Sequence, residues 1–258
     1  MRFFMLVFGL IATMAVIYFV VLFWGLGRTL QKFEHPFAKL EKPQAAVPWD
    51  SEIWTTATEA QKARVILWVD VYRSKDGQLR ALPSRLRPDA QDVLPKEIGD
   101  EGRNLKELLT EFTDRPIILN VLSSVDRIDT QVNDELADLK LPRVLVQSEY
   151  DNVMLSIKRL QPMWIYGTSA SDRVRWNMFV SLGLAPAVNF TGDIYVTPLH
   201  VRNLPAMNAG ILAEVNRRGL MLLMGPLSTV DEVRQAQAFH PNIFFVTSSE
   251  AFTALPGF

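Results

Sequence analysis

The sequence predicts an α/β fold of the (β/α)8 TIM-barrel type, preceded by one N-terminal transmembrane helix. The transmembrane helix is indicated by residues 3–26, which carry no charged side chain. The barrel is indicated by short apolar runs that alternate with helix-like segments through the rest of the chain. A doubly wound sheet would give the same alternation, but no Gly-x-Gly-x-x-Gly motif follows any of these runs. The barrel is therefore the preferred architecture.

Residues 3–26 form an apolar stretch of 24 positions between Arg2 and Arg28. As a helix this stretch would be roughly 36 Å long at about 1.5 Å per residue, enough to cross the hydrocarbon core of a bilayer. It is too long for the apolar region of a cleavable signal peptide, and no Ala-x-Ala site follows it. Trp24 stands near one end, where interfacial aromatic residues are common. A buried core helix is the alternative, but the unbroken length favours an uncleaved anchor at residues 1–27.

Residues 28–48 contain three prolines and mixed charges, and are predicted to form a tether in which His35 is solvated. Positive charges lie on both sides of the apolar stretch, and more of them follow it than precede it. A strict positive-inside count would place the following domain in the cytoplasm. Because large domains after a first helix often translocate despite such charges, we expect a single-pass membrane protein with an extracytoplasmic main domain.

Residues 49–258 are predicted to form the barrel as one domain. The opening strand is the run 65–69, which is apolar throughout and rich in β-branched residues, as expected for a strand covered on both faces. The other runs of this character are 117–122, 143–147, 163–167, 193–197, 220–224 and 243–247. A weak first strand near Val47 would bring the number of strands to eight. Residues 83–103, with several prolines and glycines, are predicted to be a surface insertion at the barrel mouth.

Helices are predicted between the strands from apolar spacing and from capping residues. One helix is expected over 51–63, and Gly219 is expected to end a later one as its C-cap. Ser171 or Asp172 is expected to cap the helix that runs to Leu182.

The helix that runs to Leu182 contains two arginines near its start. Val174 and Met178 are expected to face the core, together with Phe179, and Arg173 and Arg175 to face water. The arginines could instead bind an anion or a lipid headgroup, but their placement on a solvated helix face explains them as well.

The composition limits the possible chemistry. The net charge is −1, which gives no electrostatic footprint for nucleic acid. The chain has no cysteine, which excludes disulfides and cysteine-ligated metal sites. Its three histidines show no His-Glu-x-x-His or His-x-His spacing. We therefore predict no metal, no cofactor and no nucleic acid partner.

The opening strand ends in Trp68-Val69-Asp70-Val71, and the segments Ser74-Lys75-Asp76-Gly77 and Pro83-Ser84 follow it. These residues resemble the glycerophosphodiester phosphodiesterase family. In that family a buried strand ends in Glu-x-Asp-Val and is followed by a Thr-Lys-Asp-Gly turn and a His-Asp pair. The resemblance covers roughly residues 50–255 and implies a TIM-type barrel of the phosphodiesterase kind.

The resemblance also implies that most of the catalytic groups are missing. The family's third strand has the pattern Leu-Asn-Ile-Glu-x-Lys, and Leu122 stands here in place of its glutamate. Trp68 replaces the glutamate of the opening strand, Pro83 replaces a histidine, and the expected first strand has no histidine. A divalent cation needs several oxygen ligands, and phosphodiester cleavage needs groups that titrate near neutral pH. We therefore predict no catalytic residue and no metal site.

Two carboxylates remain as candidate ligand-binding residues. Asp70 ends the opening strand, and Glu149 lies on the loop after the strand 143–147, at the face where barrel enzymes work. Together they could form an acidic pair. The structural alternatives are a strand-end cap for Asp70, which would accept hydrogen bonds from loop N–H groups, and an exposed loop carboxylate for Glu149.

The predicted function is a membrane-anchored, catalytically inactive phosphodiesterase-like barrel. It would contact the membrane through residues 3–26 and bind a protein partner or a ligand that resembles a lipid headgroup. The alternative is a divergent phosphodiesterase with a rebuilt site, hydrolysing glycerophosphodiesters or other lipid-derived phosphodiesters. A cluster of histidines or carboxylates at the strand ends would favour this alternative. A mouth filled by apolar side chains would favour the inactive barrel.

Overall fold

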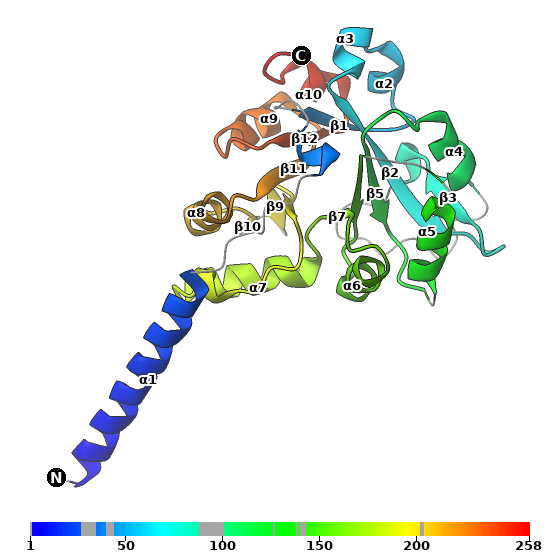
Figure 1. Ribbon diagram of the computed structural model, residues 1–258. Helices are drawn as coiled ribbons and strands as arrows, with labels where there is room; N and C mark the ends of the chain where they lie inside the picture. The colour runs from blue at the N-terminus through cyan, green and yellow to red at the C-terminus, as the bar shows by residue number, and fades with distance from the viewer. Residues whose placement is uncertain are drawn as a thin grey trace.

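The computed structural model describes residues 2–26, 35–39, 44–87, 101–125, 127–137, 139, 143–201 and 204–258. Within these residues, eight parallel strands follow one another in chain order around a barrel, and helices cover the outside (Figure 1). The barrel strands are β1 (Gln44–Pro48), β2 (Val65–Arg73), β5 (Ile117–Val121), β6 (Val144–Gln147), β7 (Ile165–Tyr166), β8 (Ile194–Thr197), β11 (Met221–Leu227) and β12 (Ile243–Val246). The predicted (β/α)8 architecture is confirmed.

The smaller strands lie outside this series. An antiparallel extension on β2 consists of β3 (Leu79–Leu82) and β4 (Arg103–Asn104), and β9 (His200–Val201) pairs with β10 (Leu204–Pro205). Most of the insertion predicted at 83–103 lies outside the described residues. Its described start forms the 3-10 helix η2 (Ser84–Leu86).

The helices of the barrel domain are α2 (Glu52–Thr56), α3 (Glu59–Lys62), α4 (Leu105–Glu111), α5 (Ile128–Ala137), α6 (Asp151–Leu160), α7 (Ala170–Ser181), α8 (Ala209–Arg218), α9 (Val230–Gln237) and α10 (Ser249–Thr253). The single helix predicted over 51–63 is wrong, because Thr58 starts a second helix, α3, with a capping box. The predicted cap of α7 is also wrong, since Ser169 is its extended N-cap residue and accepts from Asp172 N–H at 3.2 Å. Gly219 ends α8 in the left-handed conformation, as predicted.

Side chains close the barrel between β7 and β8, the two ends of the hydrogen-bonded strand path. The Thr168 hydroxyl donates to the Ile194 carbonyl and accepts from Val196 N–H, each at 2.9 Å. Asp193 N–H donates to the Tyr166 carbonyl at 2.7 Å, and the Asp193 carboxylate accepts from Tyr166 N–H at 2.9 Å. A hydroxyl can both donate and accept, so the Thr168 side chain replaces backbone hydrogen bonds that would otherwise join β7 to β8.

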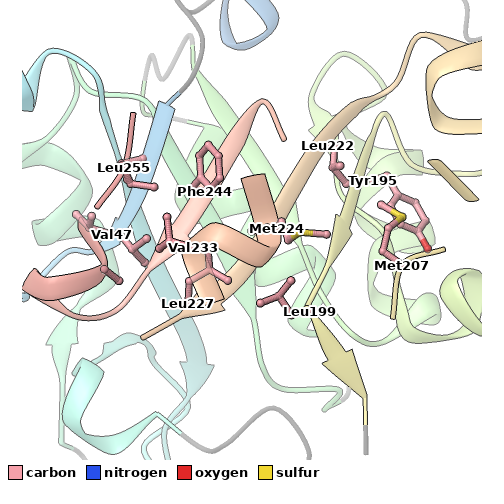
Figure 2. Close-up of a cluster of buried hydrophobic side chains, with 14 of the residues drawn as sticks. Val47, Tyr195, Leu199, Met207, Leu222, Met224, Leu227, Val233, Phe244 and Leu255 are labelled. Atoms are coloured by element: carbon pink, nitrogen blue, oxygen red, sulfur yellow. The ribbon is translucent and has the colours of Figure 1, made fainter. Parts of the chain in front are cut away.

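Apolar side chains fill both faces of the sheet. Along β2, Ile66 and Trp68 belong to a cluster inside the barrel, whereas Leu67 and Val69 belong to a cluster between strands and helices. This alternation follows from the two-residue period of a strand. Figure 2 shows a third cluster, in which Phe244 and other strand residues pack against the helices on the other side of the barrel. The β2 run is apolar throughout because it serves two cores at once.

The first strand lies within the segment predicted to be a tether. β1 pairs with both β2 and β12, so the barrel begins at Gln44 and not at residue 49. Its alanines gave a weak signal because alanine is a poor strand former.

The 3-10 helix η1 (Pro36–Lys39) places Phe37 in the interior cluster. His35 is buried and its Nδ1 accepts from Phe37 N–H at 3.2 Å, so its predicted solvation is wrong. Residues 28–34 and 40–43 of the predicted tether lie outside the described residues.

The N-terminal helix α1 (Arg2–Leu26) projects away from the barrel (Figure 1). Within the described part of the chain it is the helix that is long and apolar enough to cross a membrane, over the 23 residues Phe3–Gly25. Its C-terminal end contacts the 3-10 helix η3 (Ala185–Ala187), which follows α7. Any side chain at Gly25 would collide with the backbone of Pro186, so glycine permits this close approach.

The structure confirms the predicted inward position of Phe179, which packs against the core cluster on this side of the barrel, but it reverses the predicted positions of Val174, Met178 and Arg173. Val174 and Met178 are 69% and 53% exposed, whereas Trp176 is buried and most of the Arg173 side chain is covered. The ring of Trp176 stacks on Tyr195 with a centroid distance of 4.9 Å. This aromatic contact fixes which face of α7 points inward. The prediction failed at Val174 and Met178 because it did not weigh them against the larger ring of Trp176, which takes the inward face.

Candidate functional site

Three polar side chains lie in one row at the carboxyl ends of β2, β5 and β6. Asp70 pairs in register with Asn120, and Asn120 pairs in register with Gln147. Each follows an interior residue by two positions, so the strand period directs all three toward the barrel axis. The row lies at the end of the barrel where enzymes of this fold carry their active sites.

Asp70 is enclosed by hydrogen-bond donors from its own chain. One carboxylate oxygen accepts from Trp68 Nε1 at 2.8 Å and from Asn120 Nδ2 at 2.6 Å. The other lies 3.4 Å from Arg87 Nε. Asp70 is only 4% exposed. A carboxylate that is held by three internal donors and shielded from solvent has little capacity left for a metal ion or a substrate.

Aromatic side chains and an arginine fill the interior next to Asp70. The rings of Trp68 and Phe245 are stacked at a centroid distance of 4.1 Å and an interplanar angle of 16°. The Arg87 guanidinium lies over both rings, 4.4 Å from the Phe245 centroid and 5.1 Å from the Trp68 centroid. Cation–π contacts of this kind hold the guanidinium in place. We call the group Trp68, Phe245 and Arg87 the mouth plug.

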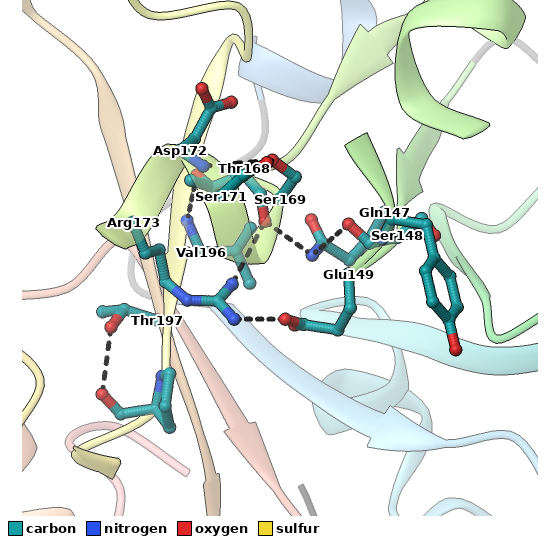
Figure 3. Close-up of polar contacts among 12 residues, drawn as sticks. Gln147, Ser148, Glu149, Thr168, Ser169, Ser171, Asp172, Arg173, Val196 and Thr197 are labelled. Carbon is teal, nitrogen blue, oxygen red and sulfur yellow. Dashed lines mark hydrogen bonds and ion pairs between the residues drawn. The ribbon is translucent and has the colours of Figure 1, made fainter. Parts of the chain in front are cut away.

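Glu149 belongs to a second polar network on the rim (Figure 3). Its carboxylate accepts from Arg173 Nη2, and the other terminal nitrogen of Arg173 donates to the Thr168 carbonyl at 3.2 Å. The same carbonyl accepts from Gln147 Nε2 at 2.9 Å. Glu149 itself is 50% exposed, so the network reaches from the inward row to the surface. Thr168, whose hydroxyl closes the barrel, thus also joins Gln147 to Arg173 through its carbonyl oxygen.

The two predicted ligand-binding carboxylates are engaged by different partners. Asp70 bonds to Arg87, Trp68 and Asn120, whereas Glu149 bonds to Arg173. Among the described residues, no group of three or more His, Asp or Glu side chains is placed to hold a metal ion. The donors at Asp70 are side chains and not the loop N–H groups that the capping alternative required.

Sequence reasoning missed Arg87 of the mouth plug and Asn120, the amide partner of Asp70. Arg87 lies in the stretch predicted to be a surface insertion, and no spacing rule connects it to Asp70. Asn120 could have been found, because in-register parallel strands place it beside Asp70. Pro83 stands at the N-cap of η2, and Leu122 follows the end of β5. Neither side chain can act as a ligand or as a general base.

Two buried carboxylates outside this row have shifted pKa values. Burial raises the pKa of Asp172, which is held by Thr191 Oγ1 at 2.7 Å and Arg175 Nη1 at 3.2 Å. Burial likewise raises the pKa of Asp193, and the Lys158 ammonium at 3.3 Å opposes this shift. Both carboxylates bond to neighbouring elements of the fold. We therefore assign them a structural role in the part of the barrel that contains β7 and β8.

A groove of about 470 Å³ has a lining that includes none of the row residues Asp70, Asn120 and Gln147. Its lining comes from β2, α4 and the region of α5, and consists of Arg73, Lys106, Arg127, Thr130, Gln131, Asp134 and Glu135. Burial raises the pKa of Glu135. Because cations and carboxylates both line the groove, it offers no single sign of charge to select a ligand.

Comparison with known proteins supports the fold. No family model matches the sequence, and no curated protein matches it. A Silicibacter pomeroyi protein assigned to the glycerophosphoryl diester phosphodiesterases aligns with a TM-score of 0.58 at 14% identity, over 91% of this chain and 96% of its own. A glycerophosphodiester phosphodiesterase from Agrobacterium tumefaciens aligns with a TM-score of 0.54 at 12% identity, over 83% and 100%.

A third structure is an Oleispira antarctica phosphodiesterase in complex with the product sn-glycerol-3-phosphate. It has a TM-score of 0.53 at 14% identity, over 80% of this chain and 93% of its own. The resemblance seen in the sequence is therefore confirmed at the level of the fold, a TIM barrel similar to the barrels of these phosphodiesterases.

Proposed function

We propose that this chain is a membrane-anchored phosphodiesterase-like barrel that has lost hydrolysis and works as a binding module at the cell envelope. The observation that carries the proposal is the mouth plug, which occupies the interior beside Asp70 with two stacked rings and a guanidinium. The fold is that of phosphodiesterases, but the space beside its one remaining carboxylate is filled by side chains of this chain itself.

The chemistry of phosphodiester cleavage explains why this arrangement favours loss of activity. A hard divalent cation takes six or more oxygen ligands, and proton transfer needs a group whose pKa lies near neutral pH. Beside the mouth plug the described residues supply Asp70 and two amides, Asn120 and Gln147. Amides do not titrate, and the carboxylate already balances the charge of Arg87.

Binding would then use the rim and not the interior. Glu149 is exposed and paired with Arg173, so this pair offers both signs of charge to a protein partner or to a ligand that resembles a lipid headgroup. Asp70 would have a supporting role, since it holds Arg87 over the two rings. This assignment keeps Glu149 as a contact residue and makes Asp70 a positioning residue.

The membrane attachment is supported by α1, whose apolar side chains remain uncovered over the length of a bilayer core. We place the barrel on the extracytoplasmic side. Because the chain has no cysteine, an Ala238→Cys variant carries one exposed thiol on the barrel. A membrane-impermeant maleimide should label this thiol in intact cells, and labelling only after lysis would contradict the orientation.

The loss of hydrolysis is tested with the full chain in detergent. Glycerophosphocholine and bis-p-nitrophenyl phosphate are supplied with calcium or magnesium, and we expect no turnover above the blank.

The alternative, a divergent phosphodiesterase, makes the opposite prediction. It requires metal-dependent turnover that disappears in Asp70→Asn and persists in Asp76→Asn. Asp76 is a suitable control because it lies in the turn after β2 and bonds to Ser74 and Arg80. That pattern of results would overturn the proposed loss of activity.

A further inference from the structure

The outward face of α7 carries no charged side chain. Its exposed residues are Ser171, Val174, Asn177, Met178 and Ser181, and the exposed Leu182 and Gly183 follow directly. A solvated barrel helix normally places charged or polar residues on this face. α9 on the same barrel does so, with exposed Asp231, Arg234 and Gln235.

The large apolar residues of this face form a stripe. Val174, Met178 and Leu182 follow one another at intervals of four residues, which aligns them along one side of a helix. They are 69%, 53% and 57% exposed. We call these three residues the α7 stripe. No described part of the chain covers it.

The charged residues of α7 are held away from the stripe by internal partners. Arg173 is drawn toward the rim by Glu149, and Arg175 is bonded to the buried Asp172. These pairs keep the helix charges on its sides and leave the outer face neutral. The outer face is uncharged because its exposed positions hold no charged residue, and the ion pairs direct the two flanking arginines to other parts of the barrel.

The transmembrane helix ends against this part of the barrel. Gly25 contacts the backbone of Pro186 in η3, and the Tyr18 hydroxyl lies 3.5 Å from the Gly183 carbonyl oxygen. Figure 1 shows the C-terminal end of α1 beside the C-terminal end of α7, with the rest of α1 extending away from the barrel and α7 along the border of the domain. The α7 stripe thus runs up to the point where α1 meets the domain.

The contacts of Tyr18 and Gly25 define how far along α1, and therefore how deep in a bilayer, the barrel meets this helix. Tyr18 and Gly25 are separated along α1 by roughly 10 Å, at about 1.5 Å per residue. Tyr18 lies within the apolar span Phe3–Gly25. Gly183 is therefore level with a residue of the span, and Leu182 precedes it directly. Tyrosines in spanning helices prefer the interface between headgroups and acyl chains.

We propose that the α7 stripe is a second membrane contact, immersed in the interface of the bilayer that α1 crosses. The proposal rests on the membrane attachment proposed above. Apolar faces of interfacial helices enter the bilayer by about 5–10 Å, a depth that matches the level of Gly183. The barrel then lies on the lipid surface along α7 and does not swing freely on its anchor.

A bilayer is favoured over a protein as the occupant because α1 already brings lipid to the end of the stripe. A second chain or another protein on the stripe would have to compete with the lipid that surrounds Tyr18 and Leu182. The neutral composition of the face also suits the region between headgroups and acyl chains, where lone charges are disfavoured.

The test uses single-cysteine variants of the full chain, which has no cysteine of its own. Met178→Cys and Val174→Cys report on the stripe, Gln235→Cys on the exposed face of α9, and Met14→Cys on the middle of α1. Each is labelled with an NBD fluorophore and reconstituted in vesicles of phosphatidylethanolamine and phosphatidylglycerol. Emission is quenched either by lipids with nitroxide-labelled acyl chains or by aqueous iodide.

We expect nitroxide lipids to quench the probes at 174 and 178 roughly twofold or more over the probe at 235, with iodide giving the reverse order. The probe at 14 separates the two proposals. If lipid quenches it while the probes at 174 and 178 behave like the probe at 235, the anchor stands and the second contact is refuted. If lipid quenches neither α1 nor α7, the membrane attachment itself fails. Probes at 174 and 178 that are shielded from both quenchers would indicate a protein occupant and would also overturn the proposal.

Discussion

The barrel mouth and the outer face of α7 both carry apolar side chains where a barrel enzyme would have polar ones. At the mouth, Trp68 and Phe245 cover each other and Arg87 covers both. On α7, Val174 and Met178 remain open. These two regions call for different explanations. At the mouth the apolar side chains are part of the core because the chain covers them itself, whereas on α7 they are exposed and the proposed membrane contact would cover them.

The largest effect is expected from removing the covered ring at the mouth. Trp68→Ala would leave a cavity beside Phe245 and take one donor from Asp70, so we expect a loss of about 3–5 kcal/mol in the free energy of unfolding. Urea unfolding of the full chain in detergent, followed by circular dichroism, measures this loss. A loss below about 1 kcal/mol would mean that the mouth is loosely packed and free to admit a ligand.

A smaller effect is expected behind the open face, where a buried ion pair supports the contact with α1. The Glu214 carboxylate accepts from Arg218 Nε at 2.5 Å, and Arg218 Nη2 donates to the carbonyl oxygens of Ala185 and Pro186 at 3.2 and 3.1 Å. Glu214→Gln removes the charge that balances Arg218. We expect a loss of about 2 kcal/mol in the free energy of unfolding at neutral pH.

The pH dependence of this loss identifies its cause. Burial would raise the pKa of Glu214, but the bonds from Arg217 and Arg218 outweigh it and hold the pKa below its ordinary value of 4.5. The unfolded state therefore takes up the proton first as pH falls. The stabilisation by the Glu214 carboxylate is present above about pH 4.5 and is lost as pH falls through its lowered pKa. The difference in the free energy of unfolding between the wild type and Glu214→Gln should therefore narrow over this range of pH. Asp231→Asn, in an exposed pair with Arg234, should change stability by less than about 0.5 kcal/mol.

Much of the fold could be predicted because strand periodicity is local. The run 65–69 reads as a strand covered on both faces, and β2 has this environment. β1 was harder, because its two alanines give a weak strand signal although it pairs on both sides. Its place in the barrel depends on pairing with β12, nearly the whole chain away. Short-range patterns therefore located strands better than domain boundaries.

The candidate site was less predictable because its contacts are long-range. Asp70 was identified from the end of its strand, but its partner Arg87 comes from a loop without a periodic pattern. The predicted inward positions of Val174 and Met178 on α7 were wrong for a related reason. Both Trp176 and the aliphatic residues Val174 and Met178 could have faced the core, and the stack on Tyr195 decided for Trp176. A sequence pattern cannot rank such competing contacts without the fold.

The smallest effect on stability is expected on the open face itself. In Met178→Gln the helix propensity and the side-chain length are nearly kept, and the side chain becomes polar. Because Met178 is 53% exposed and lies outside the buried core, the free energy of unfolding in detergent should change by less than about 0.5 kcal/mol. The same substitution should make the iodide quenching of a probe at 174 stronger in vesicles, since a polar neighbour favours water over lipid. A loss of stability as large as that of Trp68→Ala would show that α7 is covered by the chain after all, and would remove the contrast between the two regions.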